Sequence, residues 1–323
     1  MTSFVAGPHR YLVPVLPDRG ADGGADDDGR GRARTSAWPD TVQEISAQAL
    51  ATEPVDVAVL QRPHEMDLVT QWTGRRPGVD LPALYVEHDT PRGDVSGWRH
   101  PLADQDRIPI VHVTDFNAAM WDNGRAPVIV IEHGVADPGP QWTGERQTLA
   151  VCVNDPVRRW RLAGMDLAAR VARQAPIEVY GIGVRDLPER IPVGLAGVHE
   201  SLAQAELHRE LAAHRAYLHP YRWTSLGVAL IEAMMLGLPV LALAATSARD
   251  AVPIGAGLVS ADVDELTRVA RRLLADPDLA EQMGRLGRRG ALARFGLDRF
   301  LQDWEVAFSS VGAPMDVAHA VRA

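Results

Sequence analysis

Short apolar runs alternate with amphipathic stretches along the whole chain. A first series of β-rich runs, each closed by polar residues, proline or glycine, comprises HRYLVPVLP (9–17), DVAVLQ (56–61), ALYVEH (83–88), IPIVHVT (108–114) and PVIVIE (127–132). A second series comprises LAVCVN (149–154), IEVYGI (177–182), AYLHP (216–220), PVLALA (239–244) and AGLVS (256–260). Helical patterns separate these strands, such as WRLAGMDLAARVARQA (160–175) and ELHRELAAHR (206–215). The alternation predicts an α/β protein with parallel sheets, built as two doubly wound, Rossmann-like domains.

The two domains are predicted to meet in ADPGPQWTGER (136–146), a polar stretch rich in proline and glycine. We therefore expect an N-terminal domain over residues 1–138 and a C-terminal domain over residues 139–323. With 323 residues, the chain also exceeds the about 250–300 residues at which a single core usually stops growing. After Asp262 the pattern is purely helical, and the first of these closing helices is expected to pack on the second sheet.

Charge and composition narrow the possible partners. The net charge of −9 argues against a broad nucleic-acid surface, so small molecules or proteins are expected. All 33 basic residues are arginine, so any anion clamp must use arginine. The single cysteine, the lack of a signal-peptide pattern and the lack of an apolar run near ~18 residues predict a cytoplasmic protein without a transmembrane segment. The segment 19–36 has no large apolar residue and predicts a mobile loop rather than a metal site.

One carboxylate lies in a helix that is otherwise apolar on every side. Between Gly227 and Gly237 every residue except Glu232 is apolar, so the helix should be buried. A buried, ionised carboxylate costs several kcal/mol unless it is paired or hydrogen-bonded. Glu232 therefore needs either a partner within the protein, such as an arginine of a neighbouring helix, or a ligand from outside.

The start of this helix is predicted to bind an anion. It follows a strand and the polar loop YRWT, and Thr224 or Ser225 is placed to cap it. Free backbone N–H groups and the helix dipole attract negative charge at such a terminus. Glu232 lies about 7.5 Å further along the axis, at ~1.5 Å per residue, which suits a nucleotide with its phosphates at the terminus and its ribose at the carboxylate. The amides expected to face the anion are those of Leu226, Gly227 and Val228.

The segment HPYRWTSLGVALIEAMMLGLPV (219–240) resembles the signature P-S-x-x-E-G-F-G-x-x-x-x-E-A-M-A-x-G-x-P-V of retaining glycosyltransferases with the GT-B fold, of the group 1 or family 4 type. Other segments resemble the same family: VIVIEHGVAD, VRRWRLAGMDL, VYGIG, AGLVSADVDEL and ALARFGLDRF. Relatives open with a strand and a glycine-rich turn, whereas MTSFVAGPHRYLVPVLP looks like the second unit of such a domain. The first domain is therefore expected to lack its opening βα unit.

The resemblance implies that a nucleoside diphosphate sugar binds mainly to the second domain and that a hydroxyl acceptor binds to the first, with no metal and no cofactor. Glu232 matches the glutamate that holds the donor ribose, and Gly183 lies in the matching glycine turn. Arg158 matches the family's diphosphate arginine. Arg161 stands in for its lysine, although strict spacing places Ala163 there. Because a leaving diphosphate gains negative charge as the glycosidic bond breaks, guanidinium groups and helix amides would stabilise it.

Three further positions bear on the sugar and the acceptor. Thr224 stands eight positions before Glu232, where the family has a glutamate that touches hydroxyls of the transferred sugar, so sugar recognition should differ. His133 replaces the family's asparagine in the loop that closes the first domain. His88 follows a strand, where many relatives place a histidine near the donor sugar. Weaker candidates for the acceptor hydroxyl are Glu87, Asp89 and Glu132.

The sequence leaves three functions open. The first is a metal-independent retaining glycosyltransferase with a small-molecule, glycan or lipid-linked acceptor. The second is an inactive GT-B protein that binds a nucleotide sugar or a partner, as Thr224 and the short first domain suggest. The third is a Rossmann oxidoreductase based on Gly181-Ile-Gly183, but Arg185 and Asp186 stand where that fingerprint needs its third glycine.

Overall fold

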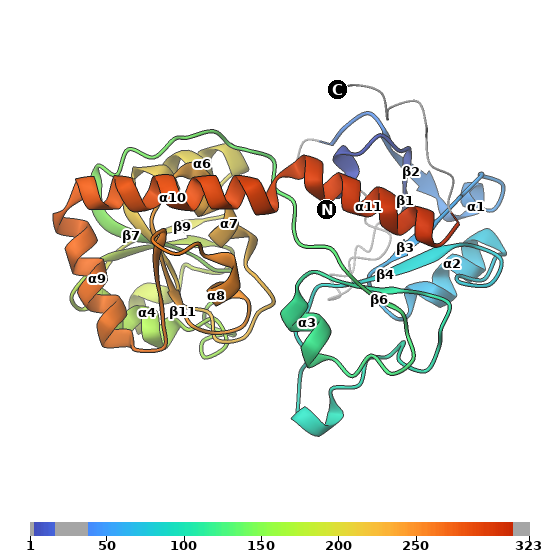
Figure 1. Cartoon of the computed structure of the whole chain (residues 1–323), viewed down its shortest axis with the longest axis horizontal. Helices are drawn as coiled ribbons and strands as arrows, with labels where there is room; N and C mark the ends of the chain where they lie inside the picture. Colours follow the sequence, from blue (N-terminus) through green and yellow to red (C-terminus); the bar gives the residue numbers. More distant parts are fainter. Residues whose placement is uncertain (1–2, 17–37, 313–323) are drawn as a thin grey trace. The chain divides into compact units, whose positions relative to one another are not determined.

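The computed structural model describes residues 3–16 and 38–312, and the chain divides into two units (Figure 1). Unit 1 comprises Met1–Gly134 and Leu297–Ala323, and unit 2 comprises Val135–Gly296. The division after Gly134 falls four residues before the predicted one, directly ahead of the polar stretch. The loop predicted over 19–36 lies outside the described residues.

Unit 2 is built on a six-stranded parallel sheet whose order reverses in the middle. The order is β12-β11-β10-β7-β8-β9, so the chain moves outward from β7 to β9, returns to the other side of β7 and continues outward to β12. This is the predicted doubly wound arrangement. The strands are β7 (Arg146–Cys152), β8 (Ile177–Gly181), β9 (Leu195–Glu200), β10 (His214–His219), β11 (Val240–Leu243) and β12 (Gly257–Ser260).

Helices cover both faces of this sheet. Successive side chains of a strand point to opposite faces, and in β7 Leu149 and Val151 join one core while Ala150 joins the other. Both sets are apolar, as expected for buried parallel strands. No helix in the described part of the chain combines the length and apolarity needed to cross a bilayer. The first face is covered by α4 (Met165–Ala172) and α9 (Val263–Ala275), and the second by α6 (Gln204–Ala213), α7 (Val228–Leu236) and α10 (Pro277–Phe295); α5 (Leu187–Arg190) and α8 (Ala248–Ala251) are short.

Unit 1 contains a smaller parallel sheet with simpler winding. Its strands follow one another in sequence order: β3 (Ala58–Leu60), β4 (Ala83–Glu87), β5 (Ile110–His112) and β6 (Val128–Val130). A separate two-stranded parallel sheet consists of β1 (Tyr11–Val15) and β2 (Val42–Ser46). The described strands β3 to β6 therefore wind in one direction, without the reversal seen in unit 2. The helices are η1 (Phe4–Ala6), α1 (Ala47–Leu50), α2 (Glu65–Thr73), η2 (Val95–Gly97) and α3 (Asp115–Met120).

The last helix, α11 (Leu297–Ser310), corrects the predicted domain assignment. The sequence placed residues 139–323 in one domain, but α11 belongs to unit 1. Its buried aromatic side chains share a core with residues of β4 and β5. An amphipathic pattern specifies that one helix face is buried, not which sheet buries it. The aromatic residues concerned are Phe300, Trp304 and Phe308.

Tertiary contacts also move one boundary between a helix and a strand. The helix predicted over 206–215 ends at Ala213, and β10 begins at His214. Arg215, the second residue of β10, is 6% exposed, and its Nε donates a hydrogen bond to the Gly144 carbonyl oxygen at 2.8 Å. A carbonyl group distant in sequence thus satisfies the buried guanidinium. Helix propensity is a local property and does not include such a tertiary contact. The apolar pattern also does not predict β2 or β9.

Replacing Trp304 with alanine should destabilise unit 1 selectively. Trp304 is 5% exposed, and truncating a buried aromatic side chain typically costs ~3–5 kcal/mol through lost burial and the cavity left behind. Hydrogen–deuterium exchange should accelerate at the amides of β4 and β5 and stay slow at β7 and β10. Val306→Ala is the control on the same helix, because Val306 is 70% exposed. Faster exchange in unit 2 instead of unit 1 would contradict the assignment of α11.

Candidate functional site

The carboxyl ends of β7 and β10 meet where the strand order of unit 2 reverses. Ligands of open α/β sheets bind at such a switch point, because the loops that follow the two strands separate there. At one point, however, the segment after β7 contacts the start of the loop after β10. A Cβ on Gly164 would lie 1.8 Å from the Pro220 carbonyl oxygen, and Gly164 has a φ of +72°. Glycine is therefore required both for space and for backbone conformation.

Helix α7 begins at this switch point without a side-chain cap. Its N-cap residue is Gly227, and neither Thr224 nor Ser225 accepts a hydrogen bond from the first turn, so the predicted cap is wrong. Within the described residues, no group accepts a hydrogen bond from the amides of Val228 and Ala229. The helix dipole adds partial positive charge at the same point. The predicted anion-binding amides that lie here are those of Leu226, Gly227 and Val228.

Glu232 is buried in α7 as predicted, but its hydrogen-bond partner is uncharged. It is 9% exposed, and Gln204 of α6 donates Nε2–H to Glu232 Oε1 at 2.5 Å. The same amide lies 2.9 Å from Nε2 of His208, which is 3.5 Å from Glu232 Oε1. No arginine in the described ranges pairs with Glu232, so the alternative of an arginine partner is wrong. The Oε2 atom has no hydrogen bond among these residues, which leaves half of the carboxylate available to a ligand.

The one cysteine of the chain ends β7 near this carboxylate. Burial raises the pKa of the Cys152 thiol, and the charge of Glu232 raises it further. Because the thiolate is the nucleophilic form, Cys152 stays protonated and unreactive near neutral pH. Tyr221 donates a hydrogen bond to the Cys152 carbonyl oxygen at 3.3 Å and so ties the loop after β10 to the end of β7.

The two arginines predicted to bind the diphosphate are paired at the surface. Arg158 Nη2 lies 2.7 Å from Asp155 Oδ2, and Arg161 Nη1 lies 2.7 Å from Asp166 Oδ2. Both arginine side chains are 74% exposed, so these ion pairs add little to stability and can exchange partners readily. Arg222 also donates two hydrogen bonds to Asp166, which hold the pKa of that carboxyl below its usual value. Diphosphate binding by Arg158 and Arg161 stays a prediction.

Arg159, between these two, has no such partner. It is half-buried, and its guanidinium forms no ion pair or hydrogen bond with any described residue. Its charge acts on the phenol of Tyr221, whose pKa burial raises to about 12. An anion could bind Arg159 without displacing a carboxylate. Spacing along the chain favours its neighbours Arg158 and Arg161 instead, because spacing does not show which arginine the fold leaves unpaired.

The turn after β8 is closed by a carboxylate of the protein itself. Glu200 accepts hydrogen bonds from the Gly183 amide at 2.8 Å and from the Val184 amide at 3.0 Å. The Gly183 amide is the main cause of the lowered pKa of Glu200. Amides occupied in this way are not free for a pyrophosphate, so this turn does not support the oxidoreductase alternative. Substrate contact by Gly183 stays a prediction.

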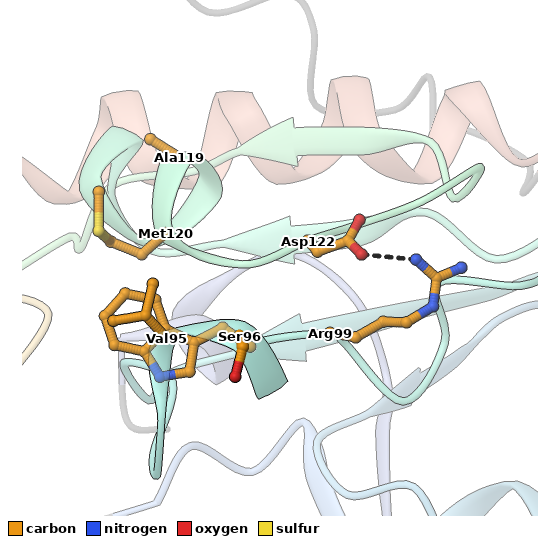
Figure 2. Close-up of a pocket in the computed structure, with 7 residues that line it drawn as sticks. Val95, Ser96, Arg99, Ala119, Met120 and Asp122 are labelled. Carbon is orange, nitrogen blue, oxygen red and sulfur yellow. Dashed lines mark hydrogen bonds and ion pairs between the residues drawn. The ribbon is translucent and has the colours of Figure 1, made fainter.

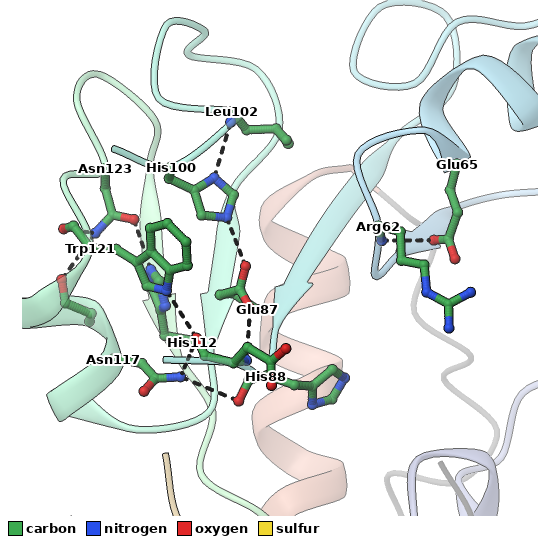
Figure 3. A network of polar contacts seen from close by, with 12 residues as sticks. Arg62, Glu65, Glu87, His88, His100, Leu102, His112, Asn117, Trp121 and Asn123 are labelled. Carbon is green, nitrogen blue, oxygen red and sulfur yellow. Dashed lines mark hydrogen bonds and ion pairs between the residues drawn. The ribbon is translucent and has the colours of Figure 1, made fainter. Parts of the chain in front are cut away.

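In unit 1, polar side chains gather at the carboxyl ends of β4 and β5 (Figure 3). His100 accepts a backbone amide through Nδ1 at 3.0 Å, so its neutral form carries the proton on Nε2, 3.2 Å from Glu87 Oε2. The other Glu87 oxygen accepts the Asp89 amide at 2.8 Å. His88 is exposed, and its Nε2 lies 3.2 Å from Gln61 Oε1. The structure thus fixes Glu87 and leaves His88 at the surface.

Helix α3 holds the turn that carries His88 and Asp89. Asn117 Nδ2 and Trp121 Nε1 both donate to the Asp89 carbonyl oxygen, at 3.2 and 3.0 Å (Figure 3). Thr114 caps the helix by accepting the Asn117 amide at 3.1 Å. These contacts fix the position of the turn relative to α3. The backbone at Asp89 is therefore held in place by α3.

The predicted residue His133 lies at the end of the unit 1 segment that precedes the division. Arg299 of α11 donates hydrogen bonds to the carbonyl oxygens of Glu132 and His133, at 3.0 and 2.8 Å. The helix that closes the chain therefore fixes the backbone at these two positions. Substrate contact by the His133 side chain stays a prediction.

A pocket of about 280 Å³ lies between η2 and α3 on unit 1 (Figure 2). Its one cationic side chain, Arg99, lies 2.6 Å from both Asp104 and Asp122. The guanidinium is therefore already neutralised, and the lining offers no unpaired charge to a ligand. We assign this pocket no function. It is lined by Val95, Ser96, Trp98, Arg99, Ala119, Met120 and Asp122.

Residues 162–276 match the family model described as Glycosyl transferases group 1. The matched region runs from α4 to α9 and contains the switch-point loop after β10, α7 and Glu232. The resemblance to glycosyl transferases group 1 is confirmed. No curated protein matches the chain at a significant level.

Solved structures of glycosyltransferases share this fold at low sequence identity. A variant of TarM from S. aureus, in complex with UDP, alpha-GlcNAc-glycerol and fondaparinux, has 13% identity and a TM-score of 0.63 over 78% of this chain and 55% of TarM. Sucrose-phosphate synthase from Thermosynechococcus elongatus has 16% identity and a TM-score of 0.64 over 82% of this chain and 77% of the synthase. HepE from Anabaena, with UDP and glucose, has 16% identity and a TM-score of 0.62 over 83% of this chain and 86% of HepE. The chain spans about half the length of TarM, and the shared fold is GT-B.

Gly164→Ala should destabilise unit 2 for two reasons, a strained backbone and a steric clash. It should therefore cost more than a glycine-to-alanine substitution that introduces the backbone strain without the clash. Gly139 is the control, because it also has a positive φ, +84°, but nothing lies within 4 Å of a Cβ there. Left-handed backbone costs a non-glycine residue roughly 1–2 kcal/mol, which we expect for Gly139→Ala. Gly164→Ala should cost at least about 2 kcal/mol more, because the loop of Pro220 must move. Equal free energies of unfolding in denaturant for the two variants would contradict the close approach of the loops.

Proposed function

We propose that the chain is a glycosyltransferase that uses a nucleoside diphosphate sugar as donor and a hydroxyl group as acceptor. The observation that carries the proposal is the half-satisfied carboxylate of Glu232, buried in a helix whose first turn has free amides. Glu232 lies five residues beyond Gly227, or about 7.5 Å along the axis at ~1.5 Å per residue, a spacing that suits one nucleotide. The match to glycosyl transferases group 1 and the GT-B fold support this function. UDP accompanies TarM and HepE, so UDP is the first nucleotide to test.

In this proposal the leaving diphosphate is stabilised at the start of α7. As the glycosidic bond breaks, its electron pair stays on the diphosphate oxygen, and negative charge develops there. Donors fixed in place before the reaction stabilise such charge without reorganising. The amides of Val228 and Ala229 and the unpaired guanidinium of Arg159 are donors of this kind. Arg158 and Arg161 can join them by exchanging carboxylate for phosphate partners.

We further propose that transfer retains the anomeric configuration and needs no metal ion. The arginines and helix amides supply the positive charge that the leaving group requires. Cys152 is held as a neutral thiol, and in this mechanism no covalent nucleophile is needed, because the leaving phosphate takes the proton of the acceptor hydroxyl. Glu87 and His88 of unit 1 are the residues proposed to contact a small-molecule, glycan or lipid-linked acceptor.

One observation favours a second candidate, a GT-B protein that binds a nucleotide sugar without turning it over. Thr224 is half-buried, caps no helix, and occupies the position of the family's sugar-binding glutamate. A hydroxyl can hydrogen-bond to a sugar but brings no charge. Consumption of a UDP-sugar by the purified chain would exclude this candidate, whereas binding without consumption would favour it.

Glu232→Gln should weaken UDP binding by roughly 5- to 150-fold, or about 1–3 kcal/mol, because a charged hydrogen-bond acceptor for the ribose is lost. Calorimetric titration with UDP, GDP, dTDP, ADP and NAD should reveal one preferred diphosphate. The loss should be much smaller with 2′,3′-dideoxy-UDP, which lacks the ribose hydroxyls. Glu281→Gln is the control, since the Glu281 side chain is 46% exposed and pairs with Arg285 in α10. If Glu232→Gln binds UDP as tightly as the unsubstituted chain, the carboxylate has a structural role and the proposed donor site is wrong.

The glycosidic bond of the product should have the same anomeric configuration as the donor sugar. Proton NMR of the reaction with a UDP-sugar, followed from its first minutes, measures this configuration directly. Addition of EDTA should leave the rate unchanged, because arginines and amides neutralise the diphosphate. An inverted product would reject the retaining mechanism, and a rate lost with EDTA and restored by a divalent cation would reject metal independence.

A further inference from the structure

Two buried histidines occupy the opposite ends of β10 and differ in their hydrogen bonds. His214 is 0% exposed, and its ring nitrogens lie 2.7 Å from Thr148 Oγ1 and 2.8 Å from the Tyr180 hydroxyl. His219 is 2% exposed, yet neither of its ring nitrogens has a partner among the described residues, and Nδ1 is fully buried. A buried polar group without a partner is costly and rare. Because Nδ1 is closed to solvent, Nε2 is the ring nitrogen that a ligand can reach.

The polar edge of the His219 ring faces the start of α7. A Cβ on Gly227 would lie 2.7 Å from His219 Cε1 and 3.6 Å from each ring nitrogen. Because Cε1 lies between the two nitrogens, this edge is the one that carries the N–H and the lone pair. The free amides of Val228 and Ala229 follow directly after Gly227. The imidazole and the first turn of the helix thus converge on the same place.

The surroundings keep His219 uncharged but leave it a hydrogen-bond donor. Burial lowers the pKa of His219 to about 4, so the ring is neutral near pH 7. A neutral imidazole has one N–H donor and one acceptor nitrogen. The ring of Tyr221 lies beside it with a centroid distance of 4.9 Å, and the charge of Arg159 acts on that tyrosine. His219 therefore adds a fixed neutral donor beside the two free amides, a combination that suits an anion.

We propose that His219 binds the phosphate moiety of the nucleotide by donating its Nε2–H to a phosphate oxygen held at the first turn of α7. The inference rests on the proposed donor site and adds a contact to it. The family signature begins one residue later, at Pro220, and assigns no role to this position. Strand β10 sets the ring at the switch point, and Gly227 allows the helix to start against it.

The test compares UDP with uridine, which has the base and ribose but no phosphate. His219→Ala should bind UDP roughly tenfold more weakly and uridine as tightly as the unsubstituted chain, because only the phosphate contact is lost. His219→Asn retains a side-chain N–H and should recover part of the UDP affinity. Glu232→Gln is the matched comparison and should weaken both ligands, since the ribose is common to them.

A second measurement needs no variant that could fail to fold. In ¹⁵N NMR of the unsubstituted chain, the ring nitrogens of His219 should shift on addition of UDP and stay unchanged with uridine. If UDP binds and depends on Glu232 but neither measurement involves His219, the inference is wrong while the proposed function stands. An equal loss of UDP and uridine would give His219 a structural role, with an ordered water as its partner. If UDP does not bind at all, the proposed donor site fails, and the inference with it.

Discussion

Burial of the unit 2 sheet on both faces is the constraint on which the rest of the structure depends. The strands β7 to β11 direct apolar side chains into one core with α4 and α9 and into another with α6, α7 and α10. Few polar groups can be accommodated between such layers, because each needs a partner inside. Hydrogen bonds satisfy both ring nitrogens of His214, whereas the buried Tyr217 hydroxyl in the same strand has no hydrogen bond among the described residues. At the carboxyl end of β10, Nδ1 of His219 is unpaired among these residues as well.

The charges at the switch point are arranged by sign along one helix. The first turn of α7 carries the positive end of the dipole with free amides, and Glu232 places a negative charge further along. Gln204 hydrogen-bonds that carboxylate without neutralising it, so its charge remains available. An arginine partner would have removed this charge and made Glu232 a structural residue. The turn after β8 illustrates a carboxylate with a structural role, because Glu200 accepts hydrogen bonds from the amides of Gly183 and Val184 there.

The three arginines after β7 have similar positions in the sequence but differ in burial and in ion pairing. Arg158 and Arg161 are exposed and paired with aspartates, whereas the half-buried Arg159 forms no ion pair with any described carboxylate. Three arginines within four positions are indistinguishable by composition. Their surroundings differ in the folded chain, and the exposed ion pairs of Arg158 and Arg161 are weak. In unit 1 the same principle applies to Arg99, which two aspartates hold at the rim of a pocket.

The sequence alone determined the α/β class, the strands of both series, the burial of Glu232 and the resemblance to glycosyl transferases group 1. These features depend on local periodicity and on spacing within one segment, which a sequence records directly. Only the tertiary structure decided that α11 packs in unit 1, that Gln204 rather than an arginine contacts Glu232, that α7 lacks a side-chain cap and that His219 is unpaired. Each of these depends on which residues meet after the chain has folded. The sequence shows that an amphipathic helix or a buried carboxylate needs a partner. The partner comes from a distant segment, and packing determines which residue it is.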